Sequence, residues 1–292
     1  MNPFSFSRLF FLGVFSVTSL FLVANERKSV RVLTYNAWYG FTKKAYRKSD
    51  WLRYVHSLQS DIVALQELNG YTEEKLAADG KFWGHKHSAL LKRDGFPTGI
   101  TSRYPIENIR RVTEGYHHGM LSCKTVGIQV YVIHLHPGHW EIRHHEIDLL
   151  LKTVASHQAS EHILLIGDFN TFSERDQAHY EQTPDMIPFF RRLDIRWKSN
   201  RNLRNDRLDY SHLQKIERAG YQDVIADRRE RFLGTFPTKL RLDEDNGPPR
   251  RLDYIFANKV LAEKCIKARY LINSKTDILS DHYPAIAEFE IE

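Results

Sequence analysis

The stretch Ile163-Leu-Leu-Ile-Gly-Asp-Phe-Asn170 joins an unbroken aliphatic run to polar residues that follow it directly. Four consecutive aliphatic residues are typical of a central strand covered on both faces, because a half-solvated strand alternates instead. Asp168 and Asn170 stand two positions apart on the emerging strand, so their side chains point the same way. The stretch therefore predicts a central strand of an α/β sheet that ends in functional groups.

Strand-like and helical patterns alternate outward from this stretch in both directions. Apolar residues at helical spacing indicate helices around residues 51–58 and 140–154. No repeat, low-complexity tract or Ser/Pro linker interrupts residues 29–292, and the polar, Arg-rich residues 171–250 are interpreted as excursions. We therefore predict one α/β domain over residues 29–292, with further strands at residues 30–35, 61–65, 126–134, 252–256 and 285–291.

Composition restricts the class of protein. The chain has 292 residues, 42% of them hydrophobic, and a formal net charge of +6, which together indicate a basic globular protein with an anionic partner. A mean hydropathy of -0.48 excludes a polytopic membrane protein. Two cysteines exclude a disulfide-built scaffold, and Cys123 and Cys265 are expected either to pair or to stay separate buried thiols.

The N-terminus has the pattern of an export segment. Arg8 precedes a mostly apolar run of residues 9–24, which is short for a bilayer span and suits the apolar core of a secretory signal. We predict that residues 1–24 are a signal peptide or, alternatively, an uncleaved N-terminal anchor. Both alternatives place the domain outside the cytoplasm, secreted or periplasmic in the first case and membrane-anchored in the second. Membrane contact is expected only for the uncleaved form.

Polar residues recur where the predicted strands end or begin. In an α/β sheet such positions gather at one edge, where ligands bind. Carboxylate and amide oxygens are ligands that suit Mg²⁺, a carboxylate can deprotonate water, and a histidine can donate to a developing phosphate charge. These residues are Asn36, Glu67, His134, Asp168, Asn170, Asp253, Asp281 and His282.

The ordered set of motifs resembles the endonuclease/exonuclease/phosphatase superfamily over nearly the whole mature chain. Gly-Asp-x-Asn and Ser-Asp-His are each moderately specific, and their order and strand context strengthen the match. The motifs are Thr34-Tyr-Asn36, Gln66-Glu67, Ser102-Arg-Tyr-Pro-Ile106, His134-Leu135, Gly167-Asp-Phe-Asn170, Arg251-Leu-Asp-Tyr-Ile255 and Ser280-Asp-His282.

The resemblance implies a four-layer α/β/β/α sandwich of two packed mixed sheets, and Mg²⁺- or Mn²⁺-dependent phosphoester hydrolysis by an in-line water. It implies that Glu67 is the main metal ligand and that Asn36 and Asp281 assist. The remaining implied roles are Asp168 as base, Asn170 and His134 at the phosphate, and His282 with Asp253 as the charge-stabilising pair. Abasic-site enzymes of the superfamily carry an acid two residues after the asparagine, where this chain has Trp38.

The substrate is less constrained, since this superfamily varies substrate through its loops. We expect Trp38 and Trp140, beside the motifs, to bind substrate. We predict a monomeric phosphodiesterase, acting on nucleic acid first and phospholipid second. A phosphomonoesterase on a sugar or inositol phosphate and a non-catalytic binding protein are the alternatives. No Lys/Arg cluster adjoins the motifs in sequence, which argues against highly charged polyphosphate substrates.

Overall fold

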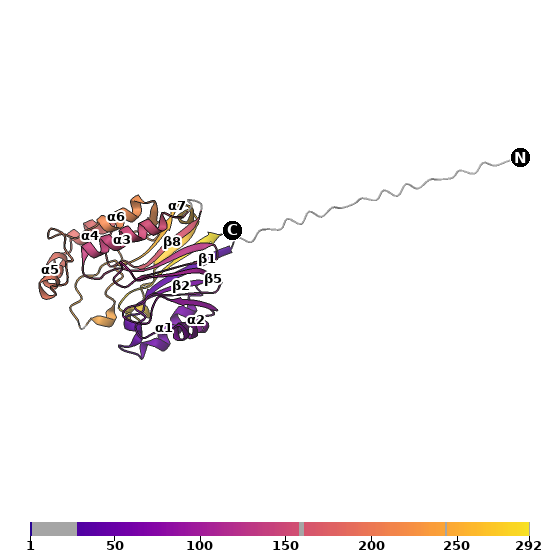
Figure 1. Ribbon diagram of the computed structural model, residues 1–292, viewed down its shortest axis with the longest axis horizontal. Coiled ribbons are helices and arrows are strands. Elements are labelled where there is room, and N and C mark those ends of the chain that lie inside the picture. Colours follow the sequence, from indigo (N-terminus) through magenta and orange to yellow (C-terminus); the bar gives the residue numbers. More distant parts are fainter. Residues whose placement is uncertain (2–27, 158–160, 243, 292) are drawn as a thin grey trace.

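Twelve strands form two six-stranded mixed sheets in the computed structural model, which describes Met1 and residues 28–157, 161–242 and 244–291 (Figure 1). The first sheet has the order β11 (Cys265–Tyr270), β12 (Ala285–Ile291), β1 (Lys28–Asn36), β2 (Ile62–Gln66), β4 (Gly99–Ser102) and β3 (His87–Leu90). The second has the order β5 (Ile106–Val112), β6 (Met120–Thr125), β7 (Ile128–His134), β8 (His162–Asp168), β10 (Asp253–Asn258) and β9 (Tyr221–Asp223).

The central strands bury both faces, as their sequences predict. In β8, Leu164 and Ile166 join the core between the two sheets, whereas Ile163 and Leu165 join a second core on the outer face. Strand residues alternate between faces, so an aliphatic residue at every position requires cover on both sides. The aliphatic run therefore indicates a strand between two apolar layers.

Helices cover the outer face of each sheet (Figure 1). Trp51 and Val55 of α1 (Arg47–Ser57) and Leu76 of α2 (Glu73–Phe82) pack against the first sheet. Apolar residues of α3 (Trp140–Val154) and α6 (Ser211–Arg218) pack against the second, with the short α7 (Lys259–Ala262) after β10. The predicted α/β/β/α sandwich is confirmed.

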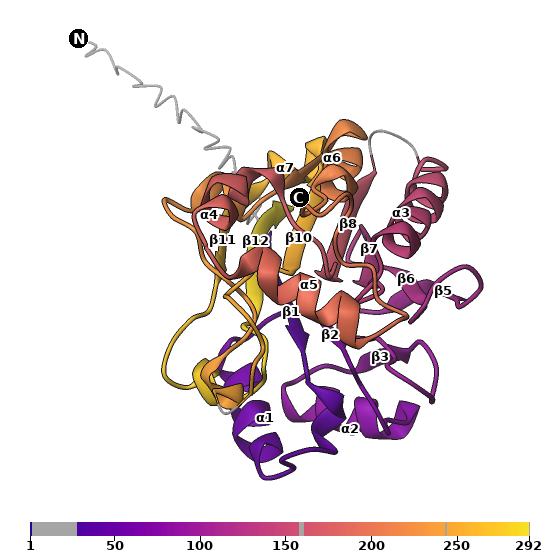
Figure 2. The ribbon, with the colours of Figure 1, turned by 90° about the vertical axis from the view of Figure 1, so that its left-hand side faces the viewer.

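Residues 171–250 carry α4 (Gln177–Glu181) and α5 (Met186–Arg196), which share a small aromatic core with Phe172. The buried Arg251 anchors this region: its Nε donates to Asp176 Oδ2 at 2.6 Å, and its Nη1 pairs with Asp223. Figure 2 shows α5 crossing in front of the edge at which β1 and β2 end. The excursions therefore cover one edge of the sheets.

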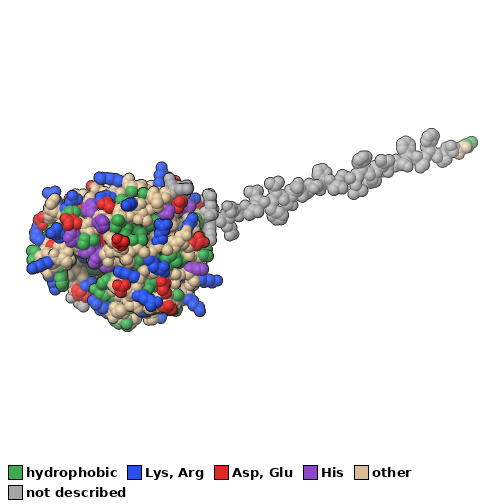
Figure 3. All heavy atoms as spheres, in the orientation of Figure 1, with side chains coloured by type: hydrophobic (Ala, Val, Ile, Leu, Met, Phe, Trp, Pro, Cys, Tyr) green, Lys and Arg blue, Asp and Glu red, His purple; other side chains and the backbone are tan. Residues whose placement is uncertain are grey.

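Except for Met1, the predicted signal or anchor segment lies outside the described residues. Within them, no helix is both long and apolar enough for a membrane span. Cys123 and Cys265 are separate buried thiols. Figure 3 shows basic and acidic side chains intermixed on the face in view.

Candidate active site

Sheet topology brings the predicted residues to one edge. β1 runs parallel to β2, so Asn36 at the end of β1 and Glu67 just after β2 lie at the same edge. β7 runs parallel to β8 with His134 opposite Asp168, and antiparallel β10 begins at Asp253, also opposite Asp168. Each strand direction therefore points a polar end at the same place.

Asn36 connects the two central carboxylates. Its Nδ2 donates to Glu67 Oε1 and to Asp168 Oδ2, both at 3.2 Å. Its Oδ1 accepts the Trp38 backbone N–H at 2.9 Å, and Glu67 Oε2 accepts the Tyr39 N–H at 3.0 Å. In this arrangement Asn36 orients the carboxylates with its amide group, and its oxygen is already occupied by Trp38.

A buried histidine–aspartate pair faces Asp168. His282 Nδ1 lies 2.8 Å from Asp253 Oδ2, and its Nε2 lies 3.7 Å from Asp168 Oδ2. Burial lowers the pKa of His282, but the charges of Asp253 and Asp168 outweigh it and raise that pKa above its ordinary value. His282 is therefore a cation at neutral pH, suited to stabilise phosphate charge.

A second imidazole contacts Asp168 from the other side. His134 Nε2 lies 3.7 Å from Asp168 Oδ2, and its ring stacks on that of His118. Burial, with the charge of His282, lowers the pKa of His134 to about 3, so this ring is neutral. Burial also raises the pKa of Asp168, as the charge of Asp253 does, which makes its carboxylate a stronger base than an exposed one.

The acidic groups fit a hard divalent cation. Burial raises the pKa of Glu67, and the charge of Asp281 raises it further. Asp281 Oδ2 accepts from Arg241 Nη1 at 3.2 Å, but its Oδ1 is buried without a hydrogen-bond partner. A half-buried and a buried carboxylate, the second with an orphaned oxygen, are the oxygen donors that Mg²⁺ and Mn²⁺ bind. Glu67 and Asp281 would hold the ion.

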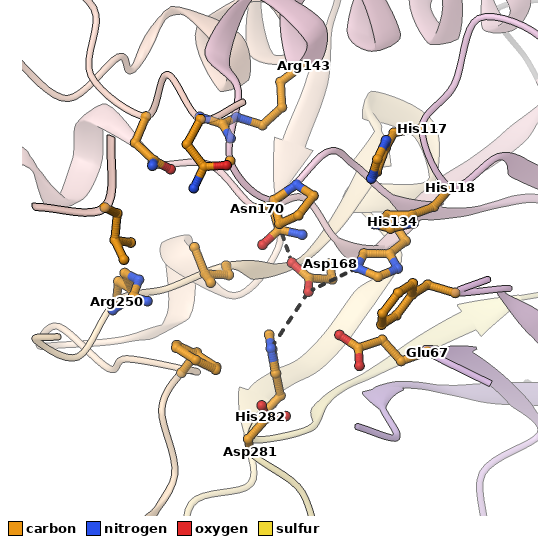
Figure 4. A pocket seen from close by; sticks show the side chains of 18 of the residues that line it. Glu67, His117, His118, His134, Arg143, Asp168, Asn170, Arg250, Asp281 and His282 are labelled. Carbon is orange, nitrogen blue, oxygen red and sulfur yellow. Dashed lines mark hydrogen bonds and ion pairs between the residues drawn. The ribbon is translucent and has the colours of Figure 1, made fainter. Parts of the chain in front are cut away.

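These groups line a cavity of about 430 Å³ (Figure 4). Glu67, His134, Asp168, Asn170, Asp281 and His282 reach it directly, and Asn36 and Asp253 support them from behind. Its other walls include the aromatic residues Trp38, Tyr39, Phe96, Phe172, Phe190, Trp197 and Phe236.

Trp140 does not line the cavity. It is the first residue of α3, and its backbone N–H donates to the Arg201 carbonyl oxygen at 2.9 Å. The Arg204 guanidinium lies over its ring, 5.0 Å from the centroid. Trp140 packs against the segment that carries Arg201 and Arg204 and does not line this cavity, so its contact with substrate stays a prediction. Trp38 does line the cavity.

Basic side chains line the cavity, which weakens the sequence-based argument against highly charged polyphosphate substrates. Arg143, Arg241 and Arg250 line the cavity, together with His117 and His118. Arg143 lies on α3, while Arg241 and Arg250 belong to the excursions after β9. Arg143 and Arg241 adjoin no motif in the chain, whereas Arg250 directly precedes the motif Arg251-Leu-Asp-Tyr-Ile255. Which arginines reach the cavity depends on packing, which is not visible in the sequence.

Comparison with known proteins agrees with this geometry. An AP endonuclease from Archaeoglobus fulgidus is similar in structure at 19% identity, with a TM-score of 0.65, over 90% of this chain and 100% of that one. The 3'-5' exonuclease NExo from Neisseria meningitidis is similar at 17% identity, with a TM-score of 0.63 and the same coverages. No match is found among curated proteins.

A sequence model described as the Endonuclease/Exonuclease/phosphatase family matches residues 33–282. That span contains every motif of the resemblance, from Thr34 to His282. The match confirms the enzyme class expected from those motifs, a metal-dependent phosphoester hydrolase. The chain belongs to the endonuclease/exonuclease/phosphatase family.

Proposed function

We propose that the protein is an exported Mg²⁺- or Mn²⁺-dependent phosphodiesterase that cleaves nucleic acid. The observation that carries this proposal is the convergence of Glu67, Asp281, Asp168 and the His282–Asp253 pair on one cavity. Acid, base and cation-binding groups within one site are what in-line hydrolysis of a phosphoester requires.

Each residue has a role that follows from its surroundings. Asp168, with a raised pKa, takes a proton from the attacking water, and Asn36 holds the carboxylate in place. The His282 cation, oriented by Asp253, donates to the phosphate oxygens as negative charge builds up on them. A cation held by Glu67 and Asp281 would neutralise phosphate charge when bound.

The walls of the cavity favour nucleic acid over the other substrates. Three arginines suit a polyanion, and the aromatic side chains offer faces on which bases can stack. The structurally similar proteins include a Neisseria 3' phosphatase, NExo, bound to a product DNA hairpin, at 16% identity and a TM-score of 0.63. Because that neighbour is a phosphatase, a phosphomonoesterase is the second candidate function. Lipid hydrolysis ranks below both, and a non-catalytic protein is disfavoured by the complete set of reactive groups.

A panel assay on the mature chain, residues 25–292, tests the activity. We expect hydrolysis of plasmid DNA or RNA with Mg²⁺ or Mn²⁺, full loss in EDTA and recovery when either ion is restored. Sphingomyelin, inositol phosphates and a chromogenic phosphodiester identify the alternatives. Turnover without a divalent ion would contradict the mechanism.

A pair of variants tests the cation site itself. Glu67→Gln is expected to require at least about tenfold more Mg²⁺ for half-maximal activity, because it removes an anionic ligand from the site. Asp50→Asn, an exposed acid on α1, serves as the control and leaves the requirement unchanged. Equal Mg²⁺ requirements in the two variants would place the ion elsewhere. N-terminal sequencing of the protein recovered from its native host tests export: a start near residue 25 supports a cleaved signal.

A further inference from the structure

Arg143 carries a buried charge on which Glu146 acts only from a distance, since both oxygens of that carboxylate accept backbone N–H groups, those of His117 and His136. Arg143 is 2% exposed, and its Nη1 donates to the His136 carbonyl at 3.1 Å. Its Nε is buried without a partner, and none of the ion pairs found among the described residues includes Arg143. Arg251, equally buried, instead pairs with Asp176 and Asp223. Arg143 therefore differs from the arginine that serves the fold.

A buried charge without a direct ion pair is costly, and an anion bound beside it reduces that cost. Arg143 lines the cavity, so an anion that enters can reach the guanidinium. The residue lies in the first turn of α3, whose N-terminus has no side-chain cap, so the positive end of the helix dipole adds to its field. Burial lowers the pKa of Arg143 only to about 10, which leaves it charged at neutral pH.

The reacting phosphate is not the group that fits Arg143. That phosphate has to lie against Asp168, His282 and the cation site at Glu67, whereas Arg143 makes no ion pair with Asp168 within 4.0 Å. In Figure 4 Arg143 enters the cavity from a side away from Glu67 and Asp281, with Asn170 between. A second anionic group on the same substrate would meet it.

We propose that Arg143 forms a second anion subsite, which binds a phosphate of the substrate other than the one that is hydrolysed. The inference rests on the proposed function and narrows it, because it requires a substrate with at least two phosphates, as a nucleic-acid strand has. A single-phosphate lipid such as sphingomyelin would leave Arg143 unpaired. Its guanidinium can give two parallel hydrogen bonds to such a phosphate, in addition to its charge.

Binding measurements test the subsite apart from catalysis. In the Asp168→Asn background, calorimetry with Mg²⁺ compares thymidine 3',5'-bisphosphate with thymidine 3'-phosphate and thymidine 5'-phosphate. We expect the bisphosphate to bind at least about tenfold more tightly than either monophosphate, as expected for a charge-assisted hydrogen bond. Arg143→Gln should remove this preference and leave monophosphate affinity within about twofold. Arg143→Lys should keep part of it, and Arg53→Gln, an exposed arginine on α1, should keep all of it.

The outcomes separate this inference from the proposed function. Equal affinity of the unaltered Arg143 protein for bisphosphate and monophosphates overturns the subsite, whether or not any Arg143 variant folds. An equal loss of affinity for all three ligands in a folded Arg143→Gln protein also overturns it, since that assigns a purely structural role. If the wild-type protein fails to cleave DNA or RNA while the bisphosphate preference holds, the proposed function fails and the subsite stands.

Discussion

Asp168 lies between two imidazoles, one cationic and one neutral. His282 is held cationic by Asp253 and Asp168, whereas His134 is kept neutral by burial and by the charge of His282. The two rings approach the same carboxylate oxygen at the same distance, 3.7 Å. Their difference therefore comes from their other surroundings: Asp253 raises the pKa of His282, whereas burial and the charges of His282 and His117 lower the pKa of His134.

Substitutions at this pair give the first prediction. Asp168→Ala and His282→Ala should each reduce phosphodiester hydrolysis at least about a hundredfold, because one removes the base and the other removes the charge that stabilises the phosphate. Steady-state kinetics on the substrate found by the panel measures the loss, and circular dichroism reports whether the fold persists. A folded variant with wild-type kcat would contradict the assigned role.

At the scale of elements, the approach of β7 to β8 depends on Gly167. Its φ is +142°, and a Cβ built on it would lie 2.0 Å from the Ile133 carbonyl oxygen of β7. Any larger residue would push the two strands apart at the point where His134 faces Asp168. The glycine before Asp168 is thus a packing requirement that positions the site.

Gly167→Ala should destabilise the protein by roughly 2 kcal/mol or more, because the clash is with backbone and no rotamer relieves it. Urea denaturation measures the change, and activity should fall more steeply than stability. Gly127→Ala is the matched control: its φ is also positive, at +78°, but nothing lies within 4 Å of the added Cβ. Equal destabilisation in both variants would show that φ, not strand separation, sets the cost.

At the scale of the whole molecule, several buried or half-buried histidines are neutral. Burial lowers the pKa of His134 and His136 to about 3 and that of His212 to about 4. His212 is the best to test, since it lies away from the cavity and its Nε2 donates to the Trp140 carbonyl at 2.8 Å. The unfolded chain takes up a proton near its ordinary pKa of about 6.5, which the folded state resists.

His212 should therefore stabilise the fold above about pH 6.5 and lose that contribution as the pH falls toward about 4. His212→Gln keeps a donor for Trp140, so its deficit in unfolding free energy should shrink by roughly 3 kcal/mol across that window. Urea titrations at several pH values measure it, with the exposed His56→Gln as control. The raised pKa values of Glu67 and Asp168 make stability change with pH in the opposite direction. Because both residues are present in the variant and in the wild-type protein, their contribution cancels in the comparison. A deficit that does not change with pH would refute it.

Local sequence patterns predicted most of the fold and most of the reacting residues. The aliphatic run at residues 163–166 required two apolar layers, and polar residues at strand ends required a common edge, because strand alternation and direction are local properties. These patterns did not predict which side chains form the walls of the cavity. Arg143 and Arg250 come from segments about a hundred residues apart in the chain, and Trp140 resembled Trp38 in its nearness to a motif. Which of these side chains is buried beside Asp168 depends on how helices and excursions pack over the sheets, and that packing follows from contacts between residues distant in sequence.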